Sequence, residues 1–370
     1  YLTKVNEGTG SAWGVPDIEI IGETRIGADN LAWEKAIKSN LGIEGKLFNN
    51  KLDFVVDIFH DQRNGIFQQR VQVPEYVGVV SNPYANVGKM KSYGADGNIS
   101  FTQDITPDFG FTLRGNFTYS KNKVQNWEQA YLEYPYLEYN NFPYNSIRGY
   151  QAIGLFKDED DIKYSPKQTF GEVMPGDIKY KDVNGDGVIN SLDERPIGYR
   201  EDSTPILNFG LNFSFGWKGF DLAFDFTGGA MGSWYQQWEQ RNPFHDGGNN
   251  PQYYMEDTWR LSDIWDADSE LIPGKYPMLL IGNSSHSNYW NSTFWKKNVR
   301  YVKLRNLELG YTLPKHIVEK ALISDLRFYV AGTNLLTFTN APGIDPESTE
   351  GNGLGYPTTR IINIGVNLKF

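Results

Sequence analysis

The residues best suited to chemistry form an acidic, glycine-bearing turn that begins at Asp182. In a calcium loop of about twelve residues, oxygen ligands stand at positions 1, 3, 5, 7, 9 and 12, and glycine at position 6 permits a sharp bend. Glycine stands at 187 here, and the ligand positions hold Asp182, Asn184, Asp186, Val188 (through its carbonyl), Asn190 and Asp193. The spacing predicts a structural Ca²⁺ site without a catalytic role. The competing interpretation is a turn closed by Asx hydrogen bonds without metal.

Aromatic side chains are concentrated in the long stretches on both sides of this turn. Large flat rings with a polar tip suit protein interfaces and ligand stacking. We expect contacts with a ligand or a covering protein at Trp127, Tyr131, Tyr134, Trp234, Tyr235 and Trp238. The alternative for each ring is that it packs its own loop together.

Other kinds of chemistry have no support in the sequence. The four histidines lack metal-ligand spacing, and we find no Ser-His-Asp arrangement and no phosphate-cradling glycine loop. The sequence has no cysteine, so disulfides contribute nothing. The net charge of −10 argues against nucleic acid as a partner. We therefore expect a protein that is not an enzyme.

Nine segments of alternating apolar and polar residues must position these loops. They lie at about 33–48, 52–58, 98–102, 109–119, 207–217, 220–226, 299–312, 326–338 and 363–370. Alternation with a period of two indicates strands with one apolar and one polar face. Between Leu304 and Leu307 the apolar set changes phase, which predicts a β-bulge near Arg305 and Asn306.

The residue types on the two faces indicate the solvent of each. Phe, Leu, Trp and Tyr crowd one face, whereas Asp, Asn and Arg recur on the other. Several segments reach the roughly 9–11 residues that a tilted strand needs to cross hydrocarbon. The sequence contains no run of about 18 apolar residues, so it predicts no transmembrane helix. The pattern predicts an all-β, antiparallel transmembrane barrel in contact with outer-membrane lipid.

The connections between these segments alternate between short and long. Short turns lie on one side, and long loops at about 64–88, 124–204, 230–298 and 339–356 lie on the other. Barrels of the bacterial outer membrane have short periplasmic turns and longer extracellular loops. The long loops are therefore expected outside the cell, and the C-terminus is expected in the periplasm.

The last segment ends on an aromatic residue. Gly365, Val366, Leu368 and Phe370 resemble the closing strand that outer-membrane barrels present to their insertion machinery. Nine strands leave open edges, which lipid cannot satisfy, and single-chain bacterial barrels have an even strand number. We expect residues 1–370 to be the C-terminal portion of a longer barrel chain. The alternative is that several copies complete one barrel.

Four segments resemble one known family in particular. They lie at 175–190, 302–314, 326–335 and 343–347. Together with the terminal strand they resemble the hallmark segments of SusC/RagA-type TonB-dependent transporters of Bacteroidetes. The resemblance covers nearly the whole chain. It implies a barrel of about 22 strands with a plug in its lumen, of which this chain would supply the last nine strands.

The same resemblance implies a function in nutrient import. It implies a glycan or oligopeptide cargo, a SusD-like surface lipoprotein as a cap, and energy from TonB–ExbB–ExbD through a plug and TonB box outside this chain. A passive porin or structural barrel is the first alternative, and upstream sequence without those two elements would favour it. A secreted calcium-dependent binding sandwich is the second alternative, and it would stay soluble without detergent.

Overall fold

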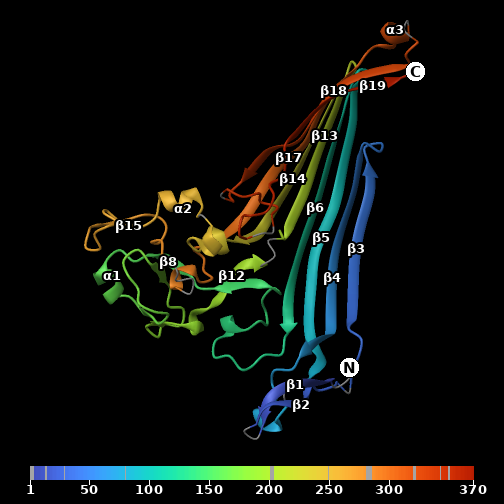
Figure 1. Ribbon diagram of the computed structural model, residues 1–370. Coiled ribbons are helices and arrows are strands. Elements are labelled where there is room, and N and C mark those ends of the chain that lie inside the picture. The colour runs from blue at the N-terminus through green and yellow to red at the C-terminus, as the bar shows by residue number, and fades with distance from the viewer. Residues whose placement is uncertain are drawn as a thin grey trace. The chain divides into compact units, whose positions relative to one another are not determined.

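The chain folds into two compact units. The computed structural model in Figure 1 describes residues 4–12, 15–28, 30–79, 81–200, 204–248, 250–280, 286–319, 322–341, 343–348 and 351–370. The first unit comprises Tyr1–Leu41, Ile58–Gly94 and Ser120–Tyr144. The second comprises Gly42–Asp57, Ala95–Tyr119 and Asn145–Phe370.

Nine strands form one sheet, which we call the strand wall. Their bounds are Lys35–Leu47 (β3), Leu52–Gln69 (β4), Tyr84–Thr106 (β5), Phe109–Asn126 (β6), Leu207–Trp217 (β13), Phe220–Tyr235 (β14), Lys296–Thr312 (β17), Asp325–Thr339 (β18) and Ile361–Lys369 (β19). Each strand pairs with its neighbours along the chain, in the order β19-β18-β17-β14-β13-β6-β5-β4-β3. Each of the nine predicted segments overlaps one of these strands, so the prediction of nine strands is confirmed, although the bounds of several strands differ from those predicted.

The register gives the wall one apolar and one polar face. One row of paired residues on the apolar face comprises Phe111, Phe215, Leu222, Leu309, Val330 and Ile364. A row on the opposite face comprises Arg114, Asn212, Asp225, Asn306 and Thr333. Leu309, Val330 and Ile364 are 50, 47 and 82% exposed. No second layer of the described residues therefore covers the apolar face there, as one would in a soluble sandwich.

The predicted bulge in β17 is confirmed. Asp225 pairs with Asn306 and Phe226 pairs with Leu304, so Arg305 is an extra residue in β17. Arg305 donates hydrogen bonds to Thr227 Oγ1 at 3.2 Å and Asn334 Oδ1 at 2.9 Å. A bulge can redirect a side chain in this way, and here it brings a guanidinium to the polar face.

The long connections lie at 70–83, 127–206, 236–295 and 340–360, and they carry short elements of their own. These are η1 (Glu75–Val77), η2 (Pro135–Leu137), β7 (Ser146–Gly149), β8 (Ala152–Leu155), α1 (Glu159–Lys163), β9 (Lys167–Gln168), β10 (Ile178–Tyr180), β11 (Val188–Ile189), η3 (Ser191–Asp193), β12 (Arg195–Arg200), η4 (Trp238–Gln240), η5 (His245–Gly247), α2 (Gln252–Glu256), β15 (Arg260–Leu261), β16 (Leu271–Ile272) and η6 (Ser287–Tyr289). A single turn, α3 (Lys315–Val318), joins β17 to β18. The first loop is shorter than predicted because β4 and β5 extend into it.

The larger of two buried hydrophobic clusters in the second unit lies mainly in its loops. We call residues 145–206 and 236–295 the loop body. A buried cluster there, which includes the last residue of β14, comprises Ile147, Tyr150, Ile178, Tyr180, Ile189, Tyr235, Tyr254 and Trp295. In Figure 1 the short elements of the loop body gather beside one end of β14 and β17.

One hairpin was not predicted. Strands β1 (Lys4–Ala12) and β2 (Val15–Arg25) pair with each other in an antiparallel two-stranded sheet. Ile18 and Ile20 alternate with acidic residues there, but the alternation is too short to stand out from the sequence. Within the described part of the chain, no helix has the length and apolar character needed to cross a membrane.

Candidate functional site

The turn at Asp182 adopts the sharp bend that the sequence predicts. The Asp182 carboxylate accepts hydrogen bonds from the Gly185 and Gly187 amides at 2.6 and 2.8 Å. Both glycines have a positive φ, of 80° and 82°, a conformation that other residues rarely adopt. The Asp186 carboxylate accepts from the Val188 amide at 2.8 Å. Asp182 and Asp186 are thus placed on one bend.

The last two predicted calcium ligands, Asn190 and Asp193, form hydrogen bonds with the backbone of their own loop. Asp193 is fully buried, and its two oxygens accept from the Val183 amide at 2.7 Å and the Asn190 amide at 2.9 Å. Asn190 Oδ1 accepts from the Leu192 amide at 2.7 Å, so Asn190 and Asp193 form a capping box around η3. These two side chains close the loop onto its own backbone.

The fit of this loop to a calcium ion is partial. Among the described residues, no three His, Cys, Asp or Glu side chains are grouped closely enough to hold a metal. Each carboxylate has about four acceptor positions, however, so a single backbone hydrogen bond to an oxygen leaves a lone pair for a cation. The bend and the two glycines are as predicted, whereas the carboxylates of Asp182, Asp186 and Asp193 are not grouped around one point.

Two of the predicted aromatic contacts line a cavity of about 440 Å³ in the first unit. They are Trp127, which is half-buried, and Tyr131, which is 90% exposed. The polar side chains of the lining are Gln72, Asn126, Glu128, Gln129, Glu138 and Asn140. Flat rings beside amides and carboxylates can stack on a ligand and also form hydrogen bonds with it. Tyr134 lies apart from the lining and stacks on Tyr136 with the ring centroids 5.4 Å apart.

Glu128 holds this cavity together. Its carboxylate accepts hydrogen bonds from Arg70 Nε at 2.5 Å and from the Val71 and Gln72 amides at 3.2 and 3.1 Å. Burial acts to raise the pKa of Glu128, but the hydrogen bonds from Gln72, Arg70 and Val71 outweigh it, so the pKa lies below the usual value. The carboxylate is therefore charged at neutral pH and joins the 70–72 segment to the cavity wall.

The structure corrects the prediction for two of the aromatic residues. Trp234 and Tyr235 are only 1 and 5% exposed, so they cannot supply a contact surface. Trp234 packs with Val299 and Tyr301, and the Tyr235 hydroxyl donates to the Trp290 carbonyl at 3.0 Å. The alternative interpretation, that a ring packs its own loop together, applies to Tyr235, which joins the buried cluster of the loop body. Trp234 lies in β14 and packs between strands instead.

Trp238 remains a candidate for contact on the second unit. It is 51% exposed, and its ring lies 4.9 Å from the ring of His245. Trp238 lies only three residues beyond buried Tyr235, where the chain has left β14. The two rings within β14 are therefore buried, whereas the ring beyond the end of the strand is exposed.

The terminal strand has the geometry that was predicted for it. Val366 pairs with Phe328 and Leu368 pairs with Leu326 on the apolar face. Val366, Leu368 and Phe370 are 55, 44 and 88% exposed. Gly365 pairs with Tyr329, and a Cβ atom at Gly365 would lie 2.4 Å from the phenol ring. Glycine at 365 therefore makes room for that ring. Recognition by insertion machinery stays a prediction.

Sequence reasoning missed a cluster of charged side chains on the polar face of the wall. Lys303 and Arg305 of β17 form ion pairs with Asp345 and Glu347 of the last loop. The signal was present as two pairs of like charges, each spaced by two residues, in segments singled out for other reasons. In β17 this spacing puts Lys303 and Arg305 on one side of the strand. Asp345 and Glu347 lie in a turn instead, where the Asp345 carbonyl accepts from the Ser348 amide at 2.9 Å.

Comparison with known proteins gives one consistent result. Residues 8–190 match a family described as "TonB dependent receptor-like, beta-barrel". TonB-dependent receptor P3 of Formosa agariphila is 27% identical over 375 residues, which cover 94% of this chain and 35% of that protein. TonB-dependent receptor SusC of Bacteroides thetaiotaomicron is 22% identical and covers 92% of this chain and 32% of its own length. The chain thus spans about a third of the length of these relatives.

A solved structure has a similar fold. The RagAB peptide importer in its "open-open" state matches with a TM-score of 0.69 at 22% identity. The match covers the whole of this chain and 38% of the solved chain.

Proposed function

Because the chain belongs to the TonB-dependent receptor-like β-barrel family, we propose that it forms part of the wall of a SusC-type nutrient importer. Barrels of this family lie in the outer membrane. The proposed cargo is an oligopeptide or an oligosaccharide. We further propose that a SusD-like surface lipoprotein caps the importer and that TonB–ExbB–ExbD supplies the energy.

The two-faced wall carries this proposal. Its apolar row ends on exposed Val330 and Ile364, and its opposite face carries Arg114, Asp225 and Asn306. A wall of this kind satisfies lipid on one side and hydrated cargo on the other. The long folded loops join the strands at one end of the sheet, and binding is expected in these loops.

The cavity beside Trp127 and Tyr131 supports the assignment of a cargo or cap contact. Stacking on rings suits sugars and peptides alike, so the cavity does not separate the two. RagAB, the solved relative, is described as a peptide importer, and this favours oligopeptides as the first cargo to test.

Uptake by the full-length protein in cells tests the proposal. Trp127→Ala and Tyr131→Ala are expected to raise the half-saturating cargo concentration on the order of tenfold, because aromatic rings that a bound ligand covers dominate the binding energy. Tyr164→Ala is the matched control, since Tyr164 is 80% exposed and does not line the cavity. Equal uptake by all three variants would remove the cavity from the proposal.

The same cells distinguish an importer from a passive porin. Uptake through the proposed importer stops when TonB is deleted or the proton gradient is collapsed, and the amount of barrel in the membrane is unchanged. Uptake that continues under both conditions identifies a porin. Recovery of the full-length protein in the soluble fraction without detergent identifies the secreted binding protein instead.

We also propose that the Asp182 loop binds Ca²⁺ through Asp182, Asn184, Asp186, the Val188 carbonyl, Asn190 and Asp193. The bend over Gly187 and the carboxylates of Asp182 and Asp186 support this proposal. The ion would stiffen a connection that runs from 127 to 206.

Terbium luminescence and limited proteolysis test the calcium site. The double variant Asp182→Asn/Asp186→Asn should lose terbium binding, and chelation should speed cleavage of the loop in the wild type only. Asp266→Asn is a matched control, because the Asp266 carboxylate also closes an Asx turn, accepting from the Asp268 amide at 3.0 Å. Unchanged terbium binding in the double variant means that the turn is held by hydrogen bonds alone.

A further inference from the structure

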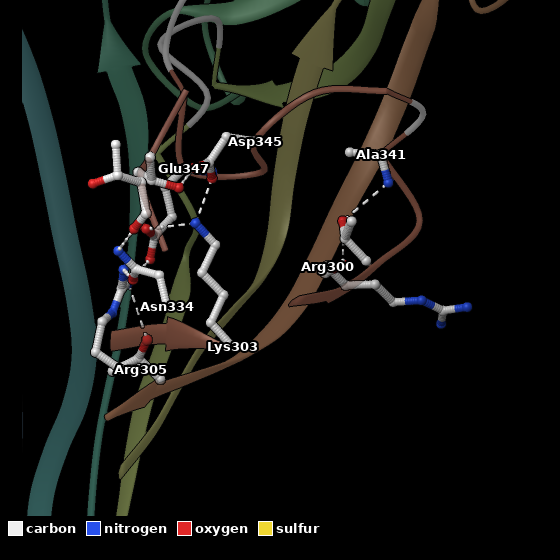
Figure 2. Close-up of polar contacts among 11 residues, drawn as sticks. Arg300, Lys303, Arg305, Asn334, Ala341, Asp345 and Glu347 are labelled. Atoms are coloured by element: carbon white, nitrogen blue, oxygen red, sulfur yellow. Dashed lines mark hydrogen bonds and ion pairs between the residues drawn. The ribbon is translucent and has the colours of Figure 1, made fainter. Parts of the chain in front are cut away.

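Residues of β17, β18 and the last loop meet in one ion cluster on the polar face of the wall. Figure 2 shows Lys303 and Arg305 from β17, Asn334 from β18, and Asp345 and Glu347 from the last loop. The first two residues lie about 40 positions from the two acidic residues. No single segment of the cluster suggests a function by itself.

Lys303 is the centre of this cluster. Its ammonium donates to Asp345 Oδ1 and, at 2.9 Å, to Glu347 Oε2. The other oxygen of Glu347 accepts from Arg305, so one carboxylate bridges two cations (Figure 2). Lys303 is only 1% exposed, which is rare for lysine and requires ion partners.

The cluster fastens a segment that we call the strap, which comprises residues 340–341, 343–348 and 351–360. Thr358 Oγ1 donates to Asp345 Oδ2 at 2.6 Å, which ties the far end of the strap to a residue near its start. Asn334 Nδ2 donates to the Thr359 carbonyl at 3.1 Å. The Gln237 amide donates to the Gly351 carbonyl at 2.9 Å, so the strap also meets the loop body.

An apolar contact adds to these polar ones. Ala341, at the start of the strap, is 7% exposed and packs with Trp234, Val299 and Tyr301. Ile344 packs against the same group. The described residues of the strap are therefore held along much of their length.

The strap is fastened to the face that a passage would use. Lys303 pairs with Thr227 on one side and Thr337 on the other. Leu304, the next residue, belongs to the apolar face, because it pairs with Phe226 and Leu336. Alternation therefore puts the Lys303 side chain, and the strap with it, on the polar side.

The use of charges for this contact is informative. Apolar residues of similar volume would hold a permanently fixed loop as well as, or better than, buried ion pairs. A buried cation that loses its partners is strongly disfavoured, so the cluster forms or opens as a unit. Contacts of this kind suit an element with two discrete positions.

We propose that the strap is a gate element, latched on the wall by the Lys303 cluster and released when the cluster opens. Lys303 is a positioning residue in this scheme. That the cluster holds the strap follows from its contacts, whereas the idea that release widens a passage rests on the proposed function.

Cysteine labelling of the full-length protein tests the latch. Residue 341 is made the only cysteine (Ala341→Cys), and the rate of maleimide modification reports how often the strap leaves the wall. Lys303→Met should raise that rate on the order of tenfold or more, because Asp345 and Glu347 lose their shared cation. Lys303→Arg should restore slow labelling, because it keeps the charge.

Lys297→Met is the matched control for loss of a lysine from the same strand. Lys297 Nζ donates to the Phe294 carbonyl at 3.2 Å and has no hydrogen bond to the described residues of the strap, so its replacement should leave the rate unchanged. Heat-modifiable migration on a gel confirms that each variant barrel is folded. A folded Lys303→Met variant with the slow wild-type rate overturns the latch.

Permeation tests the gate separately. Lys303→Met should increase the single-channel conductance of the purified importer, or the entry of a large antibiotic into cells, relative to Lys297→Met. Faster labelling without any increase in permeation overturns the gate. If the wild-type protein takes up no cargo, the proposed function is contradicted, whereas the labelling result still tests the latch.

Discussion

The strand wall and the loop body use similar apolar side chains in opposite ways. In the wall, Leu309 and Ile364 point away from the rest of the described chain and are 50 and 82% exposed. In the loop body, Tyr254 and Trp295 are fully buried. In the proposed outer-membrane location the wall faces a solvent that is itself apolar, whereas the loop body folds in water around its own core. Strand hydrogen bonds hold the first region together, and packing holds the second.

The packing of the loop body brings together residues from distant parts of the chain. Trp295 Nε1 donates to the Asn288 carbonyl at 2.6 Å, and the Asn288 amide group donates to Asp177 Oδ1 at 2.7 Å. Asn288 Oδ1 in turn accepts from the Ile178 amide at 2.8 Å. The 236–295 loop is thereby joined to the 127–206 loop.

The largest expected effect is the loss of Trp295. Trp295→Ala removes a fully buried ring and should destabilise the loop body by about 3–5 kcal/mol, while the wall stays folded. Hydrogen exchange by mass spectrometry would detect faster exchange in the loop body and unchanged exchange in β13 and β14. Trp265→Ala is the control, since that ring is 90% exposed and surface changes usually cost within about 0.5 kcal/mol. Equal exchange in the two variants would contradict a separate loop core.

A slightly smaller effect is expected on the wall. Ile364→Lys places a charge on the apolar face near the middle of β19 and should cost about 2–4 kcal/mol in the bilayer. The neighbouring variant Asn363→Lys adds the same charge to the polar face, where residue 363 pairs with Ala331. Denaturant titrations of the full-length barrel in lipid vesicles compare the two. Equal destabilisation would mean that lipid does not touch the Ile364 face.

The same contrast explains how much of the fold could be predicted. Each wall strand repeats an alternating pattern, so Leu207–Trp217 can be recognised over its whole length. Only the start of Phe220–Tyr235, residues 220–226, was predicted, because the alternation is lost in its second half. The phase change around Arg305 even located the bulge. The loop body has no such period, because its core is assembled from single residues such as Tyr254 that meet across long separations.

The candidate sites were predictable to a similar, partial extent. Spacing predicted the bend at Asp182 and Gly187, since that bend is local. Spacing did not predict that the Asp193 carboxylate accepts a backbone hydrogen bond in the cap of η3. Trp234 and Trp238 are the same residue type four positions apart, yet one is buried and the other exposed. Only tertiary packing distinguishes them.

The smallest predicted effect is on the pH dependence of stability. It depends on two carboxylates outside the strands, one fully and one partly buried. Burial raises the pKa of Asp177 despite hydrogen bonds from the Met174 amide and Asn288 and a charge interaction with His286, whose Nε2 lies 3.7 Å away. Burial acts in the same direction on Asp345, but hydrogen bonds from Lys303, Thr358 and the Glu347 amide outweigh it and lower that pKa.

The two shifts predict opposite responses to pH. A raised pKa means that folded Asp177 binds a proton more readily than the unfolded residue, so the loop body should lose stability as pH rises above about 3.9, the ordinary Asp value. A lowered pKa means that the Asp345 contribution is complete above that value and is lost as pH falls below it. Hydrogen exchange, corrected for intrinsic rates, would follow the loop body and the strap separately across this range. Asp177→Asn should flatten the profile of the loop body and leave that of the strap unchanged, because the amide does not titrate. An unchanged slope in the loop body would mean that a group other than Asp177 controls its response to pH.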